Sequence, residues 1–398
     1  PVADFIWESE CYLSDIPVQF TNNSTSNYGN VTSNNWKFYR NGGFITSSDE
    51  NPEITYPNHG DYYVELIVET EYQCIDTAIK TLHLRRTIEV EYEYFEDFEQ
   101  GVSGWYPDYI NNSTFNTNSW TFGEPDGDEV GFSGAASGIN AWYTNIGPDS
   151  PRPKEKSWVT GPCYDFRNTE RPMIKLNIWR LFDGTRDGAV LQYTTDSSKT
   201  WNDVGEINDG INWYNKYNIS VIPGDNGVGW SEIQDNNWTE ARHELDNLKG
   251  QTNVQFRIAY GSDGTAKIND GIAFDNIWIG ERKKTVLVEH FTNTLENNCK
   301  EADSLLNNIT NYSNDVIDIQ YHTSFPEGDP FYLHNQSASG TREAYYGLSA
   351  VPYSMIDGGY TGEHRFDYDL KDIEEIVIDT QALKDPLFEL QLNTENTG

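Results

Sequence analysis

Cysteine is scarce in this 398-residue chain, and its four residues never stand at C-x-x-C spacing. This argues against a disulfide-dense small domain and against a zinc site built on such pairs. No apolar run approaches the about 18 residues of a membrane-spanning helix. Basic residues are also few: 27 Lys and Arg stand against 63 Asp and Glu, and the formal net charge of −36 excludes nucleic acid as a partner, because phosphates are repelled.

Signatures of hydrolytic enzymes are missing as well. The sequence has no G-x-S-x-G and no H-E-x-x-H motif, and its seven histidines are scattered. Aromatic residues, in contrast, make up 14% of the chain, which is not a disordered composition. They stand in short alternating apolar runs between Asn-, Gly-, Asp- and Ser-rich turns, as in β-sandwiches. At about 130 residues per unit, we expect about three domains, mainly β.

Residues 1–87 alternate as PVADFIW, IPVQFTN, NWKFYR, EITY and YYVELIVET, the pattern of a small antiparallel sandwich. The order of these runs resembles a PKD domain, an Ig-type β-sandwich, most recognisably in NPEITYPNHGDYYVELIV at 51–68. Where that family commonly has Gly-Asp-Gly after the central W-x-F, this chain has Tyr-Arg-Asn-Gly-Gly at 39–43. We expect the turn to survive, because Asn-Gly tolerates positive φ.

The PKD resemblance also implies a disulfide between Cys11 and Cys74, since relatives often carry a Cys pair before the second strand and after the YYVELIV strand. Such a bond closes a loop of roughly 60 residues and stabilises the fold by roughly 4 kcal/mol in the chain-entropy model. The alternative is two unrelated buried thiols. A disulfide here favours an oxidising, extracytoplasmic location.

Residues 88–282 open with FEDFEQGVSGW and close with DGIAFDNIWIG. With SGAASGINAWYTN, SWVTGPCYDF and DGAVLQYTTDSSKTW between them, these segments resemble, in order, the jelly-roll β-sandwich of gingipain cleaved adhesin domains, and more distantly MAM domains. The resemblance implies a structural Ca²⁺ held by carboxylates of the first and last strands. The alternative for each of these acids is a solvated surface position. The residues at the corresponding places are Asp97, Glu99, Asp187 and Asp275.

Two further features of this middle segment involve aromatic residues. The run TTDSSKTW at 194–201 resembles a sialidase-type Asp-box hairpin, which lies away from catalysis and in which the Asp side chain caps backbone N–H groups. Aromatic side chains in loops are surfaces for sugar rings or partner proteins, whereas buried ones fill a sandwich core. The sequence leaves both roles open for Trp105, Trp142, Trp158, Trp213, Tyr214 and Trp230.

After a basic linker at 281–284, the pattern changes to strand, helix, strand, helix and Val-Pro strand. Residues 283–385 therefore resemble a thioredoxin-like α/β domain, which implies a cis bond before Pro352. In FTNTLENNCKEAD the resemblance places Glu296 where members have the nucleophilic Cys, and Cys299 where they have the second one. A carboxylate cannot attack a disulfide, so we expect no redox activity. We expect residues 386–398 to be the start of a further β domain or a linker.

This order of domains resembles multidomain secreted or cell-surface proteins of Bacteroidota that leave by type IX secretion. The tripeptides containing Thr77 and Ser304 resemble short O-glycosylation sites of that phylum. We expect a non-catalytic extracellular or outer-surface region, an adhesin or structural module that binds glycans or proteins and does not span a membrane. The alternative is an accessory region of a larger exported peptidase or glycosidase, and a thiol-disulfide oxidoreductase is the third hypothesis.

Overall fold

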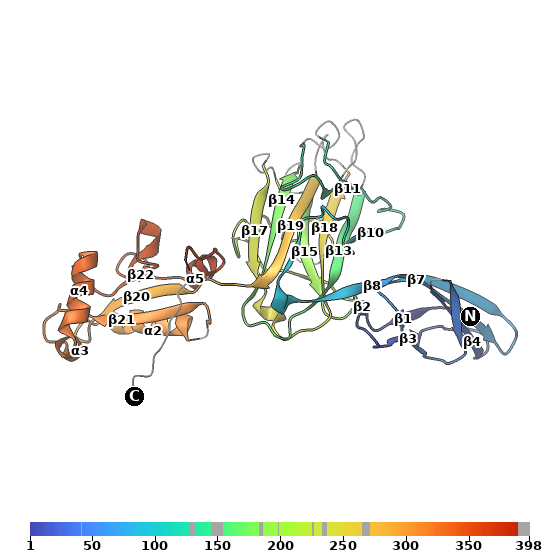
Figure 1. Ribbon diagram of the computed structural model, residues 1–398, viewed down its shortest axis with the longest axis horizontal. Coiled ribbons are helices and arrows are strands. Elements are labelled where there is room, and N and C mark those ends of the chain that lie inside the picture. Colours follow the sequence, from blue (N-terminus) through green and yellow to red (C-terminus); the bar gives the residue numbers. More distant parts are fainter. Residues whose placement is uncertain are drawn as a thin grey trace. The chain divides into compact units, whose positions relative to one another are not determined.

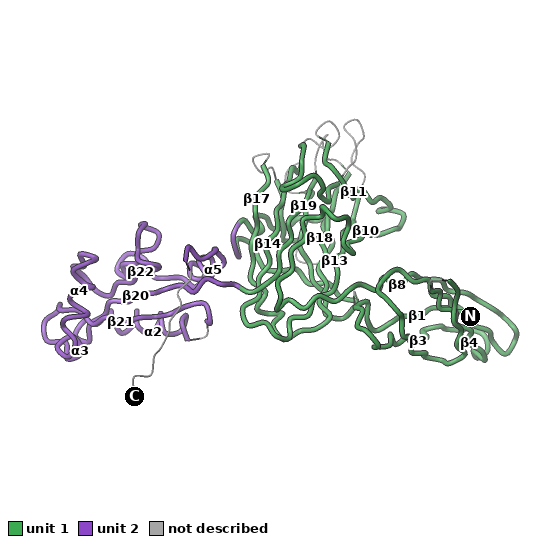
Figure 2. Tube along the Cα trace, in the orientation of Figure 1, with its two compact units in different colours: residues 1–208, 212–281 green, residues 209–211, 282–398 purple. Residues whose placement is uncertain are grey.

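The computed structural model describes residues 1–40, 42–126, 132–144, 154–182, 186–197, 199–224, 227–232, 237–264, 271–311 and 313–388. Strands predominate (Figure 1), which confirms the predicted mainly-β, β-sandwich fold class. The chain forms two compact units, coloured separately in Figure 2. Unit 1 is residues 1–208 with 212–281, and unit 2 is residues 209–211 with 282–398. In the described ranges, no helix is long and apolar enough to cross a membrane.

The first part of unit 1 is a two-sheet sandwich with an aromatic core. One sheet has the order β1-β3-β6, and the strands β8, β7, β4 and β5 form the facing layer. Burial alternates along β7, as period-2 side-chain placement requires. Phe5, Phe20, Trp36 and Phe38 are fully buried between the layers. The strand bounds are β1 Phe5–Trp7, β2 Cys11–Tyr12, β3 Val18–Asn22, β4 Val31–Arg40, β5 Gly43–Ser47, β6 Glu53–Ile54, β7 Gly60–Thr70 and β8 Ile75–Glu89.

Strand β8 runs through the boundary expected after residue 87. Its residues 75–84 pair with β7, and its residues 87–89 pair in parallel with β13 of the second sandwich. One ten-stranded sheet therefore contains strands of both sandwiches. Figure 1 shows β8 leading from one sandwich into the other.

The disulfide of unit 1 joins Cys11 to Cys163, so the predicted bond between Cys11 and Cys74 is wrong. Cys11 lies beside Arg85 on β8, whereas Cys74 precedes that strand. At about 3.3 Å per residue, positions 74 and 85 are roughly 36 Å apart, far beyond the about 6 Å that separates bonded Cα atoms. Cys163 pairs with Thr87, two residues along the same strand, and its Cα lies 5.5 Å from that of Cys11. Cys74 is exposed and free.

The second sandwich packs two sheets over a large apolar core. The first sheet has the order β16-β15-β18-β13, with β10 also paired to β13, and the second has the order β11-β12-β19-β14-β17, with β9 paired to β19. The bounds in the first sheet are β10 Tyr106–Tyr109, β13 Lys154–Asp165, β15 Gly188–Thr194, β16 Asn202–Asp203 and β18 Val254–Asp263. Those in the second are β9 Tyr94–Glu96, β11 Trp120–Gly123, β12 Ala141–Thr144, β14 Pro172–Leu181, β17 Thr239–Glu244 and β19 Gly271–Glu281, and short 3₁₀ turns cover Val90–Tyr92 and Asp246–Leu248.

Unit 2 is an α/β domain with a four-stranded sheet in the order β21-β20-β22-β23. Strands β20 and β21 are parallel, and the other pairs are antiparallel. The predicted succession of elements is present, and the Val351–Pro352 bond is cis as predicted; the family likeness stays a prediction. The bounds are β20 Val286–Thr292, α2 Cys299–Thr310, β21 Val316–His322, α3 Pro330–His334, α4 Gln336–Tyr346, β22 Tyr353–Ile356, β23 Arg365–Asp367 and α5 Glu375–Ala382, with a 3₁₀ turn at Gly362–His364. Of the segment 386–398, residues 389–398 lie outside the described ranges.

Candidate functional site

Glu99 and Asp275, two of the predicted calcium ligands, hold the same turn of the second sandwich. Glu99 Oε1 accepts hydrogen bonds from the backbone N–H groups of Ile139 and Asn140, at 2.8 and 2.7 Å. Asp275 Oδ2 accepts one from the N–H of Ser137, at 3.0 Å. Asp275 is fully buried, and this burial raises its pKa to about 6, an effect to which the charge of Glu99 adds. One buried and one partly exposed carboxylate therefore hold this turn.

The structure places the other two predicted ligands differently. Asp97 lies beside this pair, because its Oδ1 accepts from the N–H of Glu99 at 3.2 Å. Asp187 precedes β15 in the opposite sheet, and its Oδ1 accepts from the N–H of Asp263 at 2.8 Å. In the described part of the chain, no group of three or more His, Cys, Asp or Glu side chains is arranged to hold a metal. Carboxylate oxygens such as those of Glu99 and Asp275 are the type of ligand that calcium prefers. Calcium takes six to eight oxygens, and these two side chains supply fewer.

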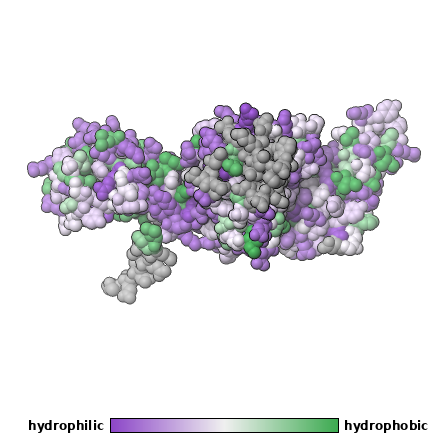
Figure 3. Space-filling model, turned by 90° about the horizontal axis from the view of Figure 1, so that it is seen from above, coloured by the Kyte–Doolittle hydropathy of each residue, from purple (hydrophilic) through white to green (hydrophobic). Residues whose placement is uncertain are grey.

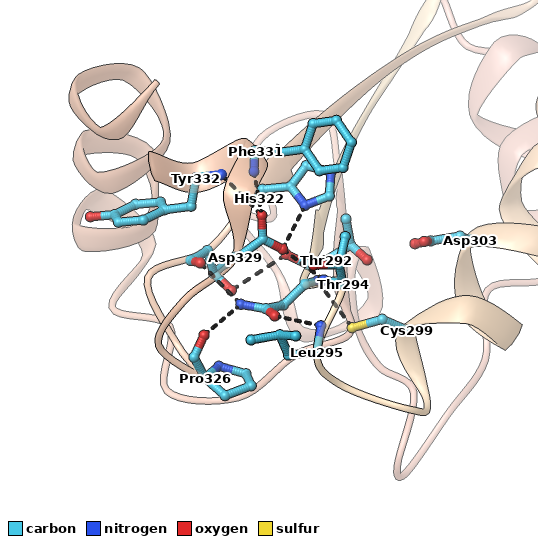
Figure 4. A network of polar contacts seen from close by, with 12 residues as sticks. Thr292, Thr294, Leu295, Cys299, Asp303, His322, Pro326, Asp329, Phe331 and Tyr332 are labelled. Carbon is cyan, nitrogen blue, oxygen red and sulfur yellow. Dashed lines mark hydrogen bonds and ion pairs between the residues drawn. The ribbon is translucent and has the colours of Figure 1, made fainter. Parts of the chain in front are cut away.

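In unit 2 the segment after β20 is fastened by a buried carboxylate, Asp329, drawn at the centre of Figure 4. Its Oδ2 accepts from the N–H of Thr294 at 2.6 Å, and Nδ1 of His322 lies 3.0 Å from the same oxygen. Its Oδ1 accepts from the first N–H groups of α3, including that of Tyr332 at 3.0 Å. Burial alone raises the pKa of Asp329, but these donors outweigh burial and hold the pKa well below its usual range. The carboxylate of Asp329 therefore joins the segment after β20 to β21 and to the start of α3 through hydrogen bonds.

The degenerate redox motif lies next to this carboxylate. Cys299 begins α2 and is buried, and its Sγ accepts from the N–H of Asn293 at 3.3 Å. Burial raises the pKa of this thiol, the reverse of what a thiolate nucleophile requires. Glu296 lies in the turn before the helix, and its carbonyl accepts from the N–H of Cys299. Pro352 is buried after its cis bond.

Unit 2 also contains a serine, a histidine and an aspartate that contact one another in sequence, and no sequence motif predicted this arrangement. Nδ1 of His290 lies 2.7 Å from Oγ of Ser354, and its Nε2 lies 2.8 Å from Oδ1 of Asp303. The hydroxyl of Tyr368 is 2.8 Å from the same serine oxygen. Ser354 and His290 are fully buried, so the hydroxyl is out of reach of a substrate. These contacts order the domain core.

The structure also decides which aromatic residues of the second sandwich are available to a ligand. Five of the six that the sequence left open are core residues, because at most 3% of each is exposed; they are Trp105, Trp142, Trp213, Tyr214 and Trp230. The sixth, Trp158 on β13, is partly exposed. Only this one of the six keeps the predicted binding role open.

Trp158 belongs to an arrangement that we call the Trp–Arg–Trp stack: Trp158, Arg257 and Trp201. The guanidinium carbon of Arg257 lies 4.2 Å from the ring centroid of Trp158 and 4.1 Å from that of Trp201. Nε of Arg257 donates to Oε1 of Gln192 at 2.8 Å. Both indole rings are partly exposed, whereas Arg257 is 7% exposed. The result is a rigid aromatic and cationic surface on the outer face of the first sheet.

The Asp-box hairpin fixes one of these rings. As predicted, Asp196 caps the hairpin: its Oδ1 accepts from the N–H of Thr200 at 2.9 Å, and its Oδ2 from the hydroxyl of Thr200 at 2.7 Å. Ser198, which replaces the usual Gly, lies outside the described residues. Trp201 follows directly and is held against Arg257. The hairpin, which looked structural in the sequence, thus positions a candidate binding residue.

The stack lies on a row of polar side chains that crosses the sheet. Five residues occupy directly opposite positions on neighbouring strands, so their side chains share one face. The row spans roughly 19 Å at about 4.8 Å per strand. At its end, the ring of Tyr106 lies 4.2 Å from the guanidinium of Arg85 in the first sandwich. In order across β16, β15, β18, β13 and β10, the row consists of Asp203, Gln192, Arg257, Thr160 and Tyr106.

Both candidate O-glycosylation residues are exposed, Thr77 on β8 and Ser304 on α2. Thr77 lies between Ile75 and Ile79, which are 62% and 63% exposed on the same face of the strand. Figure 3 shows hydrophobic patches among mainly hydrophilic atoms in this first sandwich. A glycan attached to Thr77 would cover part of that apolar face.

No protein-family model matches the chain, and no curated protein sequence does. Among solved structures, the PKD1 domain of the Vibrio cholerae metalloprotease PrtV is 30% identical, over 21% of this chain and 95% of that domain, with a TM-score of 0.18. The K1 cleaved adhesin domain of Lys-gingipain from Porphyromonas gingivalis is 13% identical, over 48% of this chain and 99% of that domain, with a TM-score of 0.29. A structure of carbohydrate-binding modules from the β-sandwich superfamily is 18% identical, over 69% of this chain and 96% of that chain, with a TM-score of 0.26. These scores do not assign a function.

Proposed function

We propose that this chain is a non-catalytic extracellular binding region and that the Trp–Arg–Trp stack is its contact surface for a glycan. The observation that carries the proposal is a cation that lies against two partly exposed indole rings on one face of a sheet. Sugar rings pack on aromatic faces, and fixed polar groups at the same place supply hydrogen bonds. The disulfide between Cys11 and Cys163 supports an oxidising compartment outside the cytoplasm.

Removing one indole of the stack tests this function. We expect Trp158→Ala and Trp201→Ala to weaken glycan binding at least about tenfold, or about 1.4 kcal/mol, because each loses one aromatic contact surface. Affinity electrophoresis of the whole chain through gels containing neutral or acidic polysaccharides measures the change.

Trp278→Ala is the matched control. This ring is also partly exposed and also carries a cation, Lys175 Nζ at 4.6 Å from its centroid, but it lies on the second sheet. The control should be retarded like the unmodified chain. Equal retardation of all four proteins would remove the stack from the proposed function, as would a complete lack of retardation by any polysaccharide.

The same proposal includes a structural Ca²⁺ at the turn held by Glu99 and Asp275. Burial raises the pKa of the Asp275 carboxyl to about 6, so its ionised form costs more free energy in the folded state than in the unfolded chain, and a nearby cation would offset that cost. Calcium takes six to eight oxygens, and carboxylates are among its preferred ligands. Glu99 and Asp275 would supply two of these, with Asp97 nearby.

The pH dependence of unit 1 tests the calcium proposal. Because folding raises the pKa of Asp275, the folded state binds its proton more tightly, and in chelator this one carboxyl should contribute about 2 kcal/mol of added stability as pH falls from 7 through 6 towards 4. Calcium should abolish this gain by holding the carboxylate ionised. Urea unfolding with chelator or with calcium measures both curves. The difference between the curves with and without calcium should disappear in Asp275→Asn, whereas the exposed Asp108→Asn should behave like the unmodified chain. Identical curves with and without calcium would contradict the proposal.

A further inference from the structure

Among the described residues, Arg257 carries a buried charge that forms no ion pair. Acids outnumber bases by 63 to 27, and two other buried arginines form ion pairs: Arg282 pairs with Asp315, and Arg85 with Asp61. Across the described ranges, Arg257 makes no ion pair, and its one hydrogen bond runs from Nε to Gln192. Its two terminal nitrogens are left without a hydrogen-bond partner there. These two nitrogens can therefore donate hydrogen bonds to a ligand.

The surroundings make this unpaired charge costly. The indole rings of Trp158 and Trp201 both lie against the guanidinium, and its terminal nitrogens keep some contact with solvent, because they are not among the fully buried polar atoms without a partner. Burial lowers the pKa of Arg257 to about 9, an effect that Asp108 and Asp203 partly offset. Buried charges are normally paired, and cation–π contact replaces only part of the lost hydration. A ligand that places a negative group beside the terminal nitrogens would supply the rest of the stabilisation that the charge loses when it leaves water.

We propose that the open edge of Arg257 binds a carboxylate and that the ligand is a glycan containing uronic acid, held by local contact with this one cation, because salt screens the more distant acids that give the chain its net charge of −36. This rests on the glycan-binding function proposed above and names the class of glycan. A guanidinium held in plane by two rings presents a flat, bidentate fork, which matches the planar geometry of a carboxylate. The flanking indole rings then contact the sugar ring that bears the carboxylate.

A saccharide fits this face better than an acidic peptide does. Peptides commonly bind sheets by adding a strand to an unpaired edge, where the main chain supplies the hydrogen bonds. Arg257 and Trp158 lie on β18 and β13, which are paired on both sides within the sheet. The face at the stack therefore offers side chains rather than backbone donors, and side-chain contacts are sufficient for a sugar.

Calorimetric titration of the whole chain with matched saccharides tests the assignment. The probes are oligogalacturonate, oligomannuronate and hyaluronan fragments, each beside its carboxyl-reduced neutral form, together with poly-glutamate. We expect at least one uronate glycan to bind, and its reduced form to bind at least tenfold more weakly. Arg257→Gln should lower affinity for the uronate form to that of the reduced form. Lys175→Gln, which removes a cation stacked on Trp278 of the second sheet, should change the affinity for neither form.

The outcomes separate the two proposals. If uronate and reduced forms bind equally and Trp158→Ala weakens both, the carboxylate assignment is overturned and the glycan-binding function stands. If no saccharide binds, both proposals are overturned. If poly-glutamate binds in an Arg257-dependent way and no saccharide does, the site recognises acidic peptides instead. Should Arg257→Gln not fold, as judged by circular dichroism, the comparison of uronate with reduced forms on the unmodified chain decides alone.

Discussion

Cys163→Ser should lower the free energy of unfolding of unit 1 by about 5 kcal/mol, the largest stability effect that we expect from one substitution in the chain. The bond between Cys11 and Cys163 spans 152 positions, and in the chain-entropy model a loop of this length restricts the unfolded state by about that amount. It also joins β2 and β13, two strands that pair with successive residues of β8. Urea unfolding without reductant measures the loss.

Cys74→Ser is the control for this experiment. Cys74 is exposed and free, so its replacement should change stability by less than about 0.5 kcal/mol. Reduction of the unmodified chain should bring it to the stability of Cys163→Ser. A large loss in Cys74→Ser together with none in Cys163→Ser would restore the pairing that the sequence alone suggested.

Asp315→Asn should destabilise unit 2 by about 3 kcal/mol. Asp315 accepts two hydrogen bonds from the guanidinium of Arg282, from Nε at 3.2 Å and from Nη2 at 2.7 Å. Both side chains are buried, with 8% and 2% exposed. Removing one charge of a buried pair leaves the other in a low-dielectric site, which typically costs about 3 to 5 kcal/mol. Thermal unfolding of the whole chain, followed by near-ultraviolet circular dichroism, shows the shift in the unit 2 transition.

The exposed carboxylate Asp369 provides the comparison in the same unit. It accepts a hydrogen bond at 3.2 Å from Asn298 at the protein surface, and surface contacts of this kind contribute little. Asp369→Asn should therefore leave the transition within about 1 kcal/mol of the unmodified chain. Equal effects of the two substitutions would mean that the Arg282 pair is not the buried contact described here.

Local patterns in the sequence were enough for much of the fold. Alternating apolar residues located β7 and β8, and the Asp-box spacing gave the capping contacts of Asp196. The Val-Pro pair gave the cis bond before Pro352. Each of these features depends on residues close together in the chain, where side-chain period and turn chemistry decide the outcome.

Features that depend on register between distant strands were beyond the sequence. The partner of Cys11 is set by which residues of β8 face β2 and β13, and no spacing rule contains that information. The stack is a similar case, because three strands or hairpins bring Trp158, Trp201 and Arg257 together. Core and surface tryptophans also look alike in a chain where both stand between turns, so burial alone separated Trp158 from Trp213 and Trp230.

The most direct test of the binding surface follows the indole N–H resonances of the 12 tryptophans in ¹⁵N-labelled protein during titration with the best-retained glycan. Because the ligand contacts the Trp–Arg–Trp stack, the signals missing from Trp158→Ala and Trp201→Ala should be the ones that shift most, and they should saturate together. The signal of Trp278 should stay in place. Saturable shifts at Trp278 or at the buried rings, with those of Trp158 and Trp201 unchanged, would contradict the proposed function.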